Sequence, residues 1–297
     1  MIYSLGEMLI DFMQEDSHYV PYPGGAPANV AAHARRRGAD AVFVGKISTD
    51  SLGDLLYATL KEHNILLPLP RSHKNTALAL VSHQNGDRSF QFYRNDTADL
   101  SLNIEDIDTI AFKPDDILHF CSLGLVAEST TRDAHHYAIQ QCQKAGGIVS
   151  FDVNLRERLW SSLDDAYAAV MALIPHVDII KVNEDELAWL TETNDVTIGM
   201  MRLQTHKQLI ICTLGAEGSK ILKPNGELIT YKPEIVQQVD TTGAGDSYIA
   251  MILASLSLSS VSFDTWLETH LEDAIAHASN VSAQVVQKQG AIPDIIY

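Results

Sequence analysis

The sequence predicts an α/β protein in which helices cover both faces of a mostly parallel central sheet. Two observations support this: short apolar runs recur along the chain, and apolar residues between them recur at helical spacing. The runs occupy residues 41–44, 117–120, 148–151, 179–182 and 209–212. Strands that are apolar throughout suit a sheet buried on both faces, and parallel neighbours need crossover helices. We therefore expect a three-layer α/β/α sandwich.

The helices and the first strand follow from local patterns. The N-terminal residues lack the basic stretch and apolar core of a secretory peptide, so they are expected to form the first strand. Residues 249–258 form the longest apolar stretch, which is far shorter than the ~20 residues of a membrane helix. A buried helix is predicted there, with no membrane partner. Further helices are predicted at residues 26–37, 50–63, 130–145 and 164–174.

Two segments interrupt this alternation of strand and helix, residues 12–24 and 75–97. The second contains strand-like residues 76–81 and 89–93 on either side of Asn85-Gly86. An Asn-Gly turn between two such runs is a hairpin signal. Extra strands inserted into an α/β body commonly cover a ligand site, so the two insertions predict a small β lid.

Composition restricts the classes of function. The 297 residues are 46% hydrophobic, and no repeat or linker divides them, so we expect a single domain over residues 1–297. The net charge of −17 argues against a nucleic-acid partner. Cys121, Cys142 and Cys212 form neither a Cys-x-x-Cys pair nor a disulfide framework, which favours a reducing, cytoplasmic location.

Residues 240–247 hold the sharpest chemical signal, directly before a long apolar helical pattern. Glycines at 243 and 245 permit a tight turn whose N–H groups converge where the helix dipole also favours anions. Gly243, Ala244 and Gly245 are therefore predicted to form an anion hole. A carboxylate at Asp246 is reasonable there if it contacts the nucleophile that attacks a phosphate. Alternatively, Asp246 only caps the helix, which is worth about 1 kcal/mol.

A second glycine-rich segment spans residues 23–31. Gly24 and Gly25 let a ligand approach the backbone, and Asn29 offers a donor and an acceptor to a vicinal diol. Asp11, at the end of a strand, can accept two hydroxyl hydrogen bonds on the same side. These residues predict a sugar site, and an ordinary turn at Gly24-Gly25 is the alternative.

Other signatures of phosphate binding or hydrolysis do not occur in the sequence. There is no Gly-x-x-x-x-Gly-Lys-Ser/Thr and no Gly-x-Gly-x-x-Gly after the first strand. There is also no His-Glu-x-x-His and no Gly-x-Ser-x-Gly. Walker-type hydrolases, dinucleotide enzymes, zinc peptidases and α/β-hydrolases are therefore disfavoured.

The two glycine-rich segments together resemble the two signatures of the ribokinase-like, or pfkB, family of carbohydrate kinases. The motifs are Gly24-Gly25-Ala26-Pro27-Ala28-Asn29 and Asp240-Thr241-Thr242-Gly243-Ala244-Gly245-Asp246, and their order and separation match over nearly the whole chain. The resemblance implies the ribokinase-like fold, ATP and a small-molecule sugar as substrates, and Mg²⁺. Residues 92–99 are most similar to fructokinases, which implies fructose, with Tyr93 and Arg94 at the sugar.

The resemblance also implies roles on the phosphate side. Asp246 matches the catalytic base, and Gly243 to Gly245 match the anion hole. Asn183 and Glu186 match an Asn-x-x-Glu motif that helps to place Mg²⁺ and the phosphates, largely through water. An N-cap asparagine followed by acidic residues explains that motif equally well. Arg156 matches a position that reaches the γ-phosphate, and an ordinary surface arginine is the alternative.

On the nucleotide side, residues 213–218 resemble the family's glycine loop, which implies that Thr213, Gly215 and Gly218 lie near the ATP. Asn280 matches the region that flanks the adenine. Asp240 and Thr242 match positions that help to hold a monovalent cation, so the resemblance implies a K⁺ site.

Several alternatives stay open. A 2-keto-3-deoxygluconate kinase, a ribokinase or a nucleoside kinase would share the same motifs, and Arg94 could bind the carboxylate of an acid substrate. A sugar-binding sensor that no longer transfers phosphate is a different class, disfavoured because the motifs are intact. Exposed edges of the lid strands, together with the resemblance, predict a homodimer.

Overall fold

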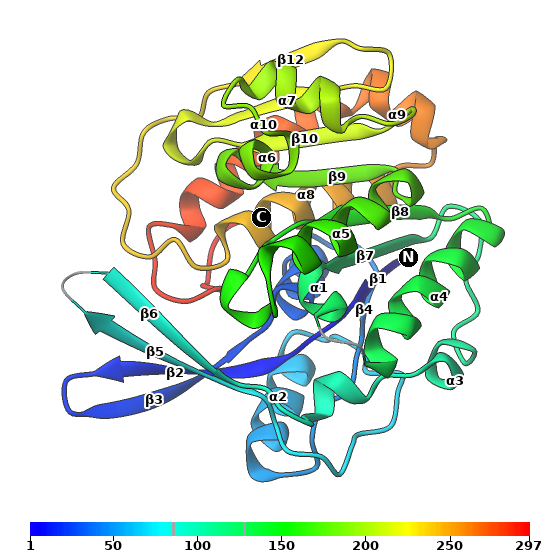
Figure 1. Cartoon of the computed structure of the whole chain (residues 1–297). Coiled ribbons are helices and arrows are strands. Elements are labelled where there is room, and N and C mark those ends of the chain that lie inside the picture. Colours follow the sequence, from blue (N-terminus) through cyan, green and yellow to red (C-terminus); the bar gives the residue numbers. More distant parts are fainter. Residues whose placement is uncertain (85–86, 127–128) are drawn as a thin grey trace.

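One large sheet forms the centre of the molecule, with helices on both faces and a smaller sheet projecting from one side (Figure 1). The computed structural model describes residues 1–84, 87–126 and 129–297. Among these residues the large sheet has eight strands, in the order β12 (Leu228–Tyr231), β11 (Ser219–Leu222), β10 (Leu209–Thr213), β9 (Ile179–Asn183), β8 (Ile148–Asp152), β7 (Ile117–Cys121), β1 (Ile2–Leu5) and β4 (Ala41–Val44). Strands β11 and β12 are antiparallel to their neighbours and the others are parallel.

The helices form two layers, as the α/β/α prediction requires. One layer holds α3 (Ile104–Ile107), α4 (Thr130–Lys144), α5 (Leu163–Leu173), α6 (Glu184–Thr191) and α7 (Val196–Leu203). The other holds α1 (Ala26–Arg36), α2 (Ser51–Glu62), α8 (Ala244–Leu258), α9 (Phe263–Thr269) and α10 (Leu271–Val285). Short 3₁₀ turns connect several elements, at Ala98–Ser101, Ser122–Leu125, Glu157–Leu159, Ile174–His176 and Gly215–Glu217. The predicted fold class, five apolar strands and four helices are confirmed, with helix ends shifted by a residue or two.

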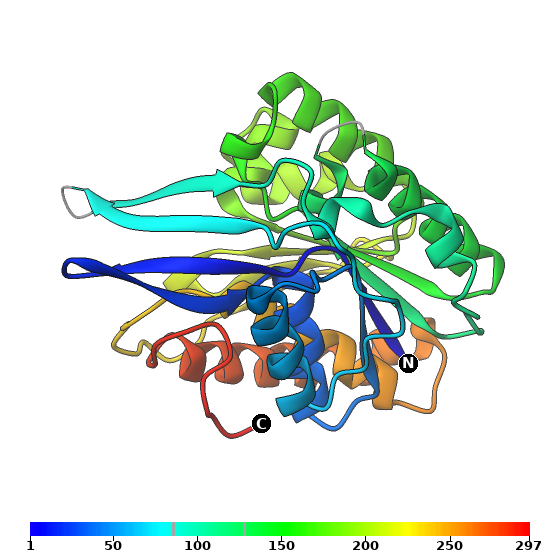
Figure 2. The same ribbon diagram turned by 90° about the horizontal axis from the view of Figure 1, so that it is seen from below.

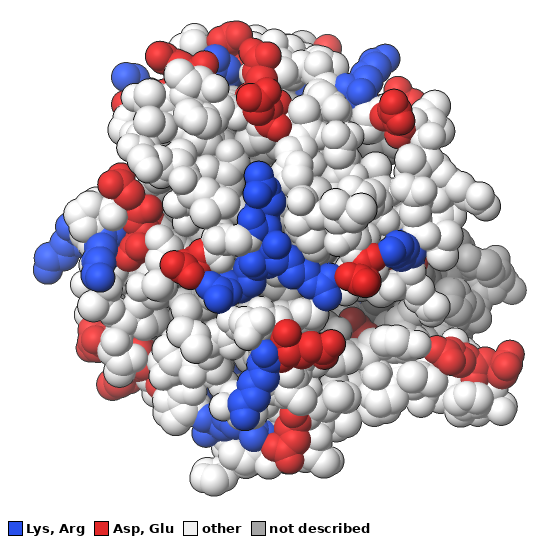
Figure 3. Space-filling model, turned by 180° about the vertical axis from the view of Figure 1, so that it is seen from behind, with Lys and Arg blue, Asp and Glu red and all other residues white. Residues whose placement is uncertain are grey.

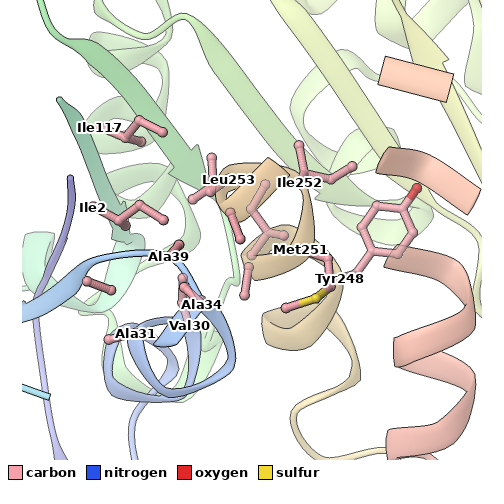
Figure 4. Packing of buried hydrophobic residues seen from close by; sticks show 14 of the residues in the cluster. Ile2, Val30, Ala31, Ala34, Ala39, Ile117, Tyr248, Met251, Ile252 and Leu253 are labelled. Atoms are coloured by element: carbon pink, nitrogen blue, oxygen red, sulfur yellow. The ribbon is translucent and has the colours of Figure 1, made fainter. Parts of the chain in front are cut away.

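Along each strand, alternate side chains point to opposite faces of the sheet, so each helical layer packs on its own hydrophobic core. Ile117 packs in the cluster beneath α1 and α8, whereas the next residue, Leu118, packs against α4 on the opposite face. Figure 4 shows the first cluster, where Val30, Ala31 and Ala34 of α1 face the apolar side chains of α8. Small alanines on α1 let the two helices approach closely, which fixes their relative position at the site described below.

Helix α8 is apolar on nearly all sides because it is buried between α1 and α10. Residues 249–254 are buried, so the predicted buried helix is confirmed. In the part of the chain that the structure describes, no single helix is long and apolar enough to cross a membrane. Among the described residues, α8 and α9 together reach that length and hydrophobicity, but the two helices are bent by 114° relative to each other.

The smaller sheet is the predicted lid, and it projects away from the body (Figure 2). Within residues 1–84 and 87–126 it has four strands, in the order β3 (His18–Gly24), β2 (Leu9–Glu15), β5 (Leu78–Gln84) and β6 (Asp87–Tyr93). The two predicted insertions therefore pair through β2 and β5. The expected Asn85-Gly86 turn lies outside the described residues.

One aspartate joins the lid to the body. Asp50 caps α2 by accepting a hydrogen bond from the Gly53 N–H at 2.7 Å. The same carboxylate accepts from the N–H of Thr76 at 2.8 Å and from its hydroxyl at 2.7 Å, just before β5 begins. The base of the lid is thus tied to a rigid helix start.

Candidate active site

A cavity of about 500 Å³ lies between the lid and the carboxyl edge of the large sheet. In a parallel sheet this edge is where ligands bind, because the loops that follow the strands converge there. The lid side is lined by Leu9, Asp11, Met13, Val81 and Phe92; the body side by Glu7, Gly25, Ala26, Asn29, Leu123, Asp152, Asn154, Arg156, Lys181, Thr241, Thr242, Gly243, Gly245 and Asp246. We call it the acceptor cavity.

A second cavity, of about 200 Å³, lies on the other side of the start of α8. Its walls come from the loop after β10, from residues 233–238 and from α10. We call it the donor cavity. Thr241 and Gly245 line both cavities, so the two compartments meet at the N-terminus of α8.

Gly243 creates the turn between the two cavities. It is the N-cap of α8 in the left-handed conformation, with φ of 77° and no side-chain cap. A Cβ there would lie 2.4 Å from the Ala291 carbonyl oxygen, so only glycine fits. The first N–H groups of a helix have no intrahelical acceptor, and those of Ala244, Gly245 and Asp246 begin α8. The geometry of an anion-binding turn is therefore present.

Asp246 lies in the first turn of α8 and lines the acceptor cavity. The alternative that Asp246 is the N-cap is wrong, because Gly243 occupies that position. Asn29 Nδ2 donates to Asp246 Oδ2 at 2.8 Å, which joins the two glycine-rich motifs across α1 and α8. Burial raises the pKa of Asp246 to about 6, although the Asn29 hydrogen bond and the charge of Lys181 act in the opposite direction.

Sequence reasoning missed a buried ion pair beside Asp246. Lys181 Nζ, on β9, donates to Asp152 Oδ2, on β8, at 2.7 Å, and the two side chains are 7% and 2% exposed. Burial alone would lower the pKa of Lys181, but the carboxylates of Asp152 and Glu186 outweigh it and raise that pKa. A Cβ on Gly245 would lie 3.1 Å from Lys181 Nζ, so this cation lies against the anion-binding turn. In the sequence, the signal for this ion pair is a lysine within an otherwise apolar strand.

Asn183 and Glu186 form a reciprocal capping box at the start of α6. Asn183 Oδ1 accepts from the Glu186 N–H at 2.8 Å, and Glu186 Oε2 accepts from the Asn183 N–H at 2.9 Å. Glu186 Oε1 also accepts from the Leu155 N–H at 2.8 Å. The capping interpretation is therefore confirmed, and it places the buried Glu186 next to the Asp152–Lys181 pair.

Three of the predicted sugar residues, Asp11, Gly25 and Asn29, line the acceptor cavity where the lid joins the body. Gly24 lies beneath Asp11, because a Cβ on Gly24 would meet Asp11 Oδ2 at 2.4 Å. Gly25, with φ of 122°, caps α1, and a Cβ there would meet the Glu7 carbonyl oxygen at 2.6 Å. Burial raises the pKa of Asp11 to about 6, opposed by the charge of Arg156, whose exposed side chain lines the same cavity.

Two predicted sugar residues lie elsewhere. Tyr93 is 49% exposed, and the adjacent Phe92 lines the cavity instead, because neighbouring residues of a strand point to opposite faces. Arg94 is buried, with Nε donating to Asp99 Oδ2 at 2.5 Å and Nη1 donating to the Leu123 carbonyl at 2.9 Å. It lines a neighbouring cavity rather than the acceptor cavity. The sequence does not show that Asp99 pairs with Arg94.

Glu7, which follows β1, is a further lining residue that sequence reasoning missed. Its side chain lines the acceptor cavity, the residue is 2% exposed, and Oε2 has no hydrogen-bond partner among the described residues. Burial raises the pKa of Glu7 to about 7, partly opposed by the charge of Arg94. An acidic residue directly after a buried strand was the available signal.

The donor cavity contains most of the predicted nucleotide residues. Thr213, Gly215 and Gly218 line it. Asn280 does not: it is exposed, and Ser279, Ser282 and Ala283 of α10, with Val286 at its C-cap, line the cavity instead. Residues three, four and seven apart share one helix face, and Asn280 lies off that face. The loop at residues 233–238 was missed because it has no periodic pattern.

Asp240 and Thr242 are brought together just before the anion-binding turn. Asp240 Oδ1 accepts from the Thr242 N–H at 3.0 Å and from its hydroxyl at 2.7 Å, and Oδ2 accepts from the Gly290 N–H at 3.1 Å. Asp240 is buried. Throughout residues 1–84, 87–126 and 129–297, no group of three or more His, Cys, Asp or Glu side chains is arranged to hold a metal ion.

An α/β/α fold with two cavities that meet at a glycine-capped helix start, beside a carboxylate, is the arrangement expected of a phosphotransferase that acts on a small-molecule hydroxyl. The pfkB family carbohydrate kinase model matches residues 1–296, and the chain belongs to that family.

Relatives and solved structures agree with this class over the full length. The chain is 36% identical to Fructokinase-1 of Oryza sativa subsp. japonica, covering 99% of this chain and 94% of that protein. It matches a double mutant of Vibrio cholerae O395 fructokinase bound to fructose, ADP and potassium at TM-score 0.87 and 31% identity, covering 98% and 93% of the two chains. It matches Salmonella enterica aminoimidazole riboside kinase at TM-score 0.86 and 26% identity, covering 98% and 95%.

Proposed function

We propose that this carbohydrate kinase transfers the γ-phosphoryl group of ATP to a primary hydroxyl of fructose. The observation that supports it most directly is the position of Asp246, which lines the acceptor cavity at the turn shared with the donor cavity. Relatives of 31–36% identity are fructokinases, and one of them binds fructose and ADP. Phe92, Asp11 and Asn29 supply an apolar surface and polar partners of the kind that a sugar needs.

In this proposal Asp246 is the general base. Its carboxylate orients the sugar hydroxyl and accepts its proton as the new bond between oxygen and the γ-phosphorus forms. The bond from that phosphorus to the bridging oxygen breaks, and ADP leaves with the electron pair. Because the transition state is loose, the proton moves late. Asn29 holds Oδ2 at 2.8 Å, which leaves Oδ1 to face the hydroxyl.

Positive charge and N–H donors offset the charge of the transferred group. The Ala244 N–H donates to the Thr241 carbonyl at 3.3 Å, so in this proposal the N–H groups of Gly245 and Asp246, in the first turn of α8, bind the equatorial oxygens. Lys181 and Arg156 line the same cavity, and we propose that both stabilise the γ-phosphoryl group. In a chain of net charge −17, these two cations and the backbone N–H groups are the positive partners that the cavity offers to a phosphate.

Two positions offer oxygen atoms to a cation. Asp152 lines the acceptor cavity and its Oδ1 is buried without a hydrogen-bond partner among the described residues, while the nearby Glu186 accepts backbone hydrogen bonds with both oxygens. We propose that Asp152, Glu186 and Asn183 hold Mg²⁺, largely through water, and that Mg²⁺ supplies charge neutralisation. The buried Asp240 carboxylate, with Thr242, suits a monovalent cation behind the anion-binding turn. Thr213, Gly215 and Gly218 would hold the nucleotide.

A coupled ADP-release assay tests the proposal. The purified protein, MgATP and a panel of fructose, ribose, 2-keto-3-deoxygluconate, adenosine and glucose are compared with and without K⁺. We expect turnover on fructose, with Asp246→Asn as the inactive control. Preferred turnover on the acid would assign Arg156 to its carboxylate and replace fructose as the substrate. Fructose binding in calorimetry without any ADP release would instead identify a sensor.

A further inference from the structure

The last residues of the sequence return from α10 across the start of α8 to α1. This segment, residues 290–297, is drawn in red beyond α10 (Figure 2). Two of its contacts reach α1: Arg36 Nη1 donates to the Pro293 carbonyl at 2.6 Å, and the Arg36 guanidinium lies 5.9 Å from the centre of the Tyr297 ring. We call residues 290–297 the closing segment.

The closing segment lies directly against the anion-binding turn. A Cβ on Gly243 would lie 2.4 Å from the Ala291 carbonyl oxygen and 2.7 Å from Ala291 Cα. The neighbouring Gly290 donates its N–H to Asp240 Oδ2 at 3.1 Å. The backbone of residues 290 and 291 therefore packs against Gly243 on the side away from the acceptor cavity.

Both ring nitrogens of His33 hydrogen-bond to residues of the closing segment. Its side chain is buried, with Nε2 2.9 Å from the Ala291 carbonyl oxygen and Nδ1 2.7 Å from the Tyr297 hydroxyl. A carbonyl oxygen only accepts, so Nε2 carries the hydrogen, Nδ1 accepts and the Tyr297 hydroxyl donates. This requires a neutral ring, and burial lowers the pKa of His33 to about 4.

His33 and Asn29 are four residues apart on α1 and therefore share one face of the helix. Asn29 donates to Asp246, while His33 donates to Ala291 behind Gly243. One helix face thus contacts both the proposed base and the backbone that supports the anion-binding turn. The alanines of α1 and its packing against α8 keep that face at a fixed distance (Figure 4).

We propose that His33 and Tyr297 are positioning residues for phosphoryl transfer: through Ala291 they hold Gly243 in the conformation that aims the N–H groups of α8 at the transferred group. The proposal rests on the proposed kinase function. Neither side chain lines the acceptor or the donor cavity, so neither contacts the substrates. Their effect is confined to the geometry of the turn, which matters because a misplacement of about 1 Å at a catalytic group can cost about 10²-fold in rate.

The experiment compares His33→Leu, His33→Gln and Tyr297→Phe with the unaltered chain. Leucine removes both hydrogen bonds, glutamine keeps a donor for the Ala291 carbonyl, and Tyr297→Phe removes only the hydroxyl. Tyr137→Phe is the matched control, since the Tyr137 hydroxyl donates to Asp108 Oδ1 on the other helical layer. For each protein we would measure kcat, both KM values, Tm, and the affinities for ADP alone and for ADP with aluminium fluoride plus fructose.

We expect His33→Leu to lower kcat by about 10-fold and Tyr297→Phe by about 3-fold, with both KM values within about twofold. Affinity for ADP should be unchanged, whereas affinity for the aluminium fluoride complex should fall in parallel with kcat. His33→Gln should recover most of kcat. Unchanged kcat with a lowered Tm would overturn the proposal, as would equal losses for both ligands. If the unaltered protein has no kinase activity, the proposed function fails instead.

Discussion

Asp246 combines two properties that a general base needs. Its carboxylate is fixed by Asn29 at 2.8 Å, and burial raises its pKa to about 6, so it is ionised at neutral pH yet basic enough to accept a proton. A base of ordinary aspartate pKa would accept the proton less readily. In the proposed mechanism, the helix start that binds the phosphoryl group thus also holds the proposed base next to the nucleophile.

Replacing this carboxylate tests the assignment. Asp246→Asn keeps the shape and the contact with Asn29 but cannot accept a proton, so kcat should fall by about 10²-fold to 10⁴-fold. The KM for the sugar should change little, because the amide still hydrogen-bonds to a hydroxyl. Steady-state kinetics with Asn154→Ala as a cavity control would check this. Retention of more than about a tenth of kcat would exclude Asp246 as the base.

The rate should also depend on pH with a definite sign. The active form of Asp246 is ionised, and its pKa is about 6, so kcat/KM should be constant above that pH and fall as the pH drops below it. Glu7, with a pKa of about 7, and Asp11, with a pKa of about 6, face the same cavity. The profiles of Glu7→Gln and Asp11→Asn therefore serve as controls. If the fall in kcat/KM at low pH disappears in either variant, that fall is due to the replaced residue and not to Asp246.

Lys181 combines a structural and a proposed catalytic charge, and a double variant with Asp152, a proposed Mg²⁺ ligand, tests the structural one. Lys181→Met leaves the Asp152 carboxylate buried and unpaired, so the free energy of unfolding should fall by about 3 kcal/mol and kcat/KM by about 10²-fold. Adding Asp152→Asn should restore stability but not activity. Urea unfolding and kinetics on both proteins would check this. Recovered activity in the double variant would show that Lys181 only balances Asp152.

Among the elements, one helix cap also attaches the lid to the body. Asp50 joins the start of α2 to Thr76 at the base of β5. Asp195 caps α7 in the same way through the Ile198 N–H at 2.9 Å, and α7 lies in the opposite helical layer. Both α2 and α7 are capped by an aspartate, but the Asp50 carboxylate also holds the base of the lid, whereas the Asp195 carboxylate caps α7 in the other layer.

Asp50→Ala should lower the free energy of unfolding by about 1–3 kcal/mol, because the cap and both Thr76 hydrogen bonds are lost. It should also raise the KM for the sugar, since the lid loses its attachment. Asp195→Ala should cost only about 1 kcal/mol and leave KM unchanged. Burial alone would raise the pKa of Asp50, but hydrogen bonds from Thr76 and Gly53 lower it to about 2. Its contribution should therefore be present above about pH 4 and lost as the pH falls to about 2.

For the whole molecule, the edge strands of the lid indicate how two copies of the chain would pair. Its outer strands are β3 and β6, and β3 contains Pro21 and Pro23, which cannot donate to a further strand. Strand β6 contains no proline and exposes Tyr93, which is 49% accessible. A homodimer formed through the lid would therefore use β6 rather than β3.

Light scattering during gel filtration tests this arrangement. We expect twice the chain mass of 32.7 kDa for the unaltered protein. Tyr93→Asp should shift it toward the monomer, because an apolar contact becomes charged. Tyr19→Asp, on β3, changes a similarly exposed aromatic and should leave the dimer intact. A monomer at all concentrations, or an equal effect of the two variants, would contradict the prediction.

On the face drawn in Figure 3, positive and negative side chains lie next to each other. Lys and Arg side chains cluster near the middle of the face in Figure 3, with Asp and Glu on either side. Arg35, for example, pairs with Asp40 at 2.6 Å. The next residue, Arg36, is not simply part of a solvated helix face, because it donates to the Pro293 carbonyl of the closing segment.

The sequence by itself determined the fold class, the five core strands and the two glycine-rich motifs, because burial periodicity and turn chemistry are local. The chemistry of two short segments also indicated Asp246 and Asn29 as candidate site residues, whereas the glycine loop followed from the resemblance to the family. Only the tertiary structure decided that Asp246 meets Asn29, that Lys181 pairs with Asp152, and that Arg94 turns to Asp99. Those outcomes depend on which side chains distant in sequence share a buried site, and burial together with charge pairing is settled only when the layers pack.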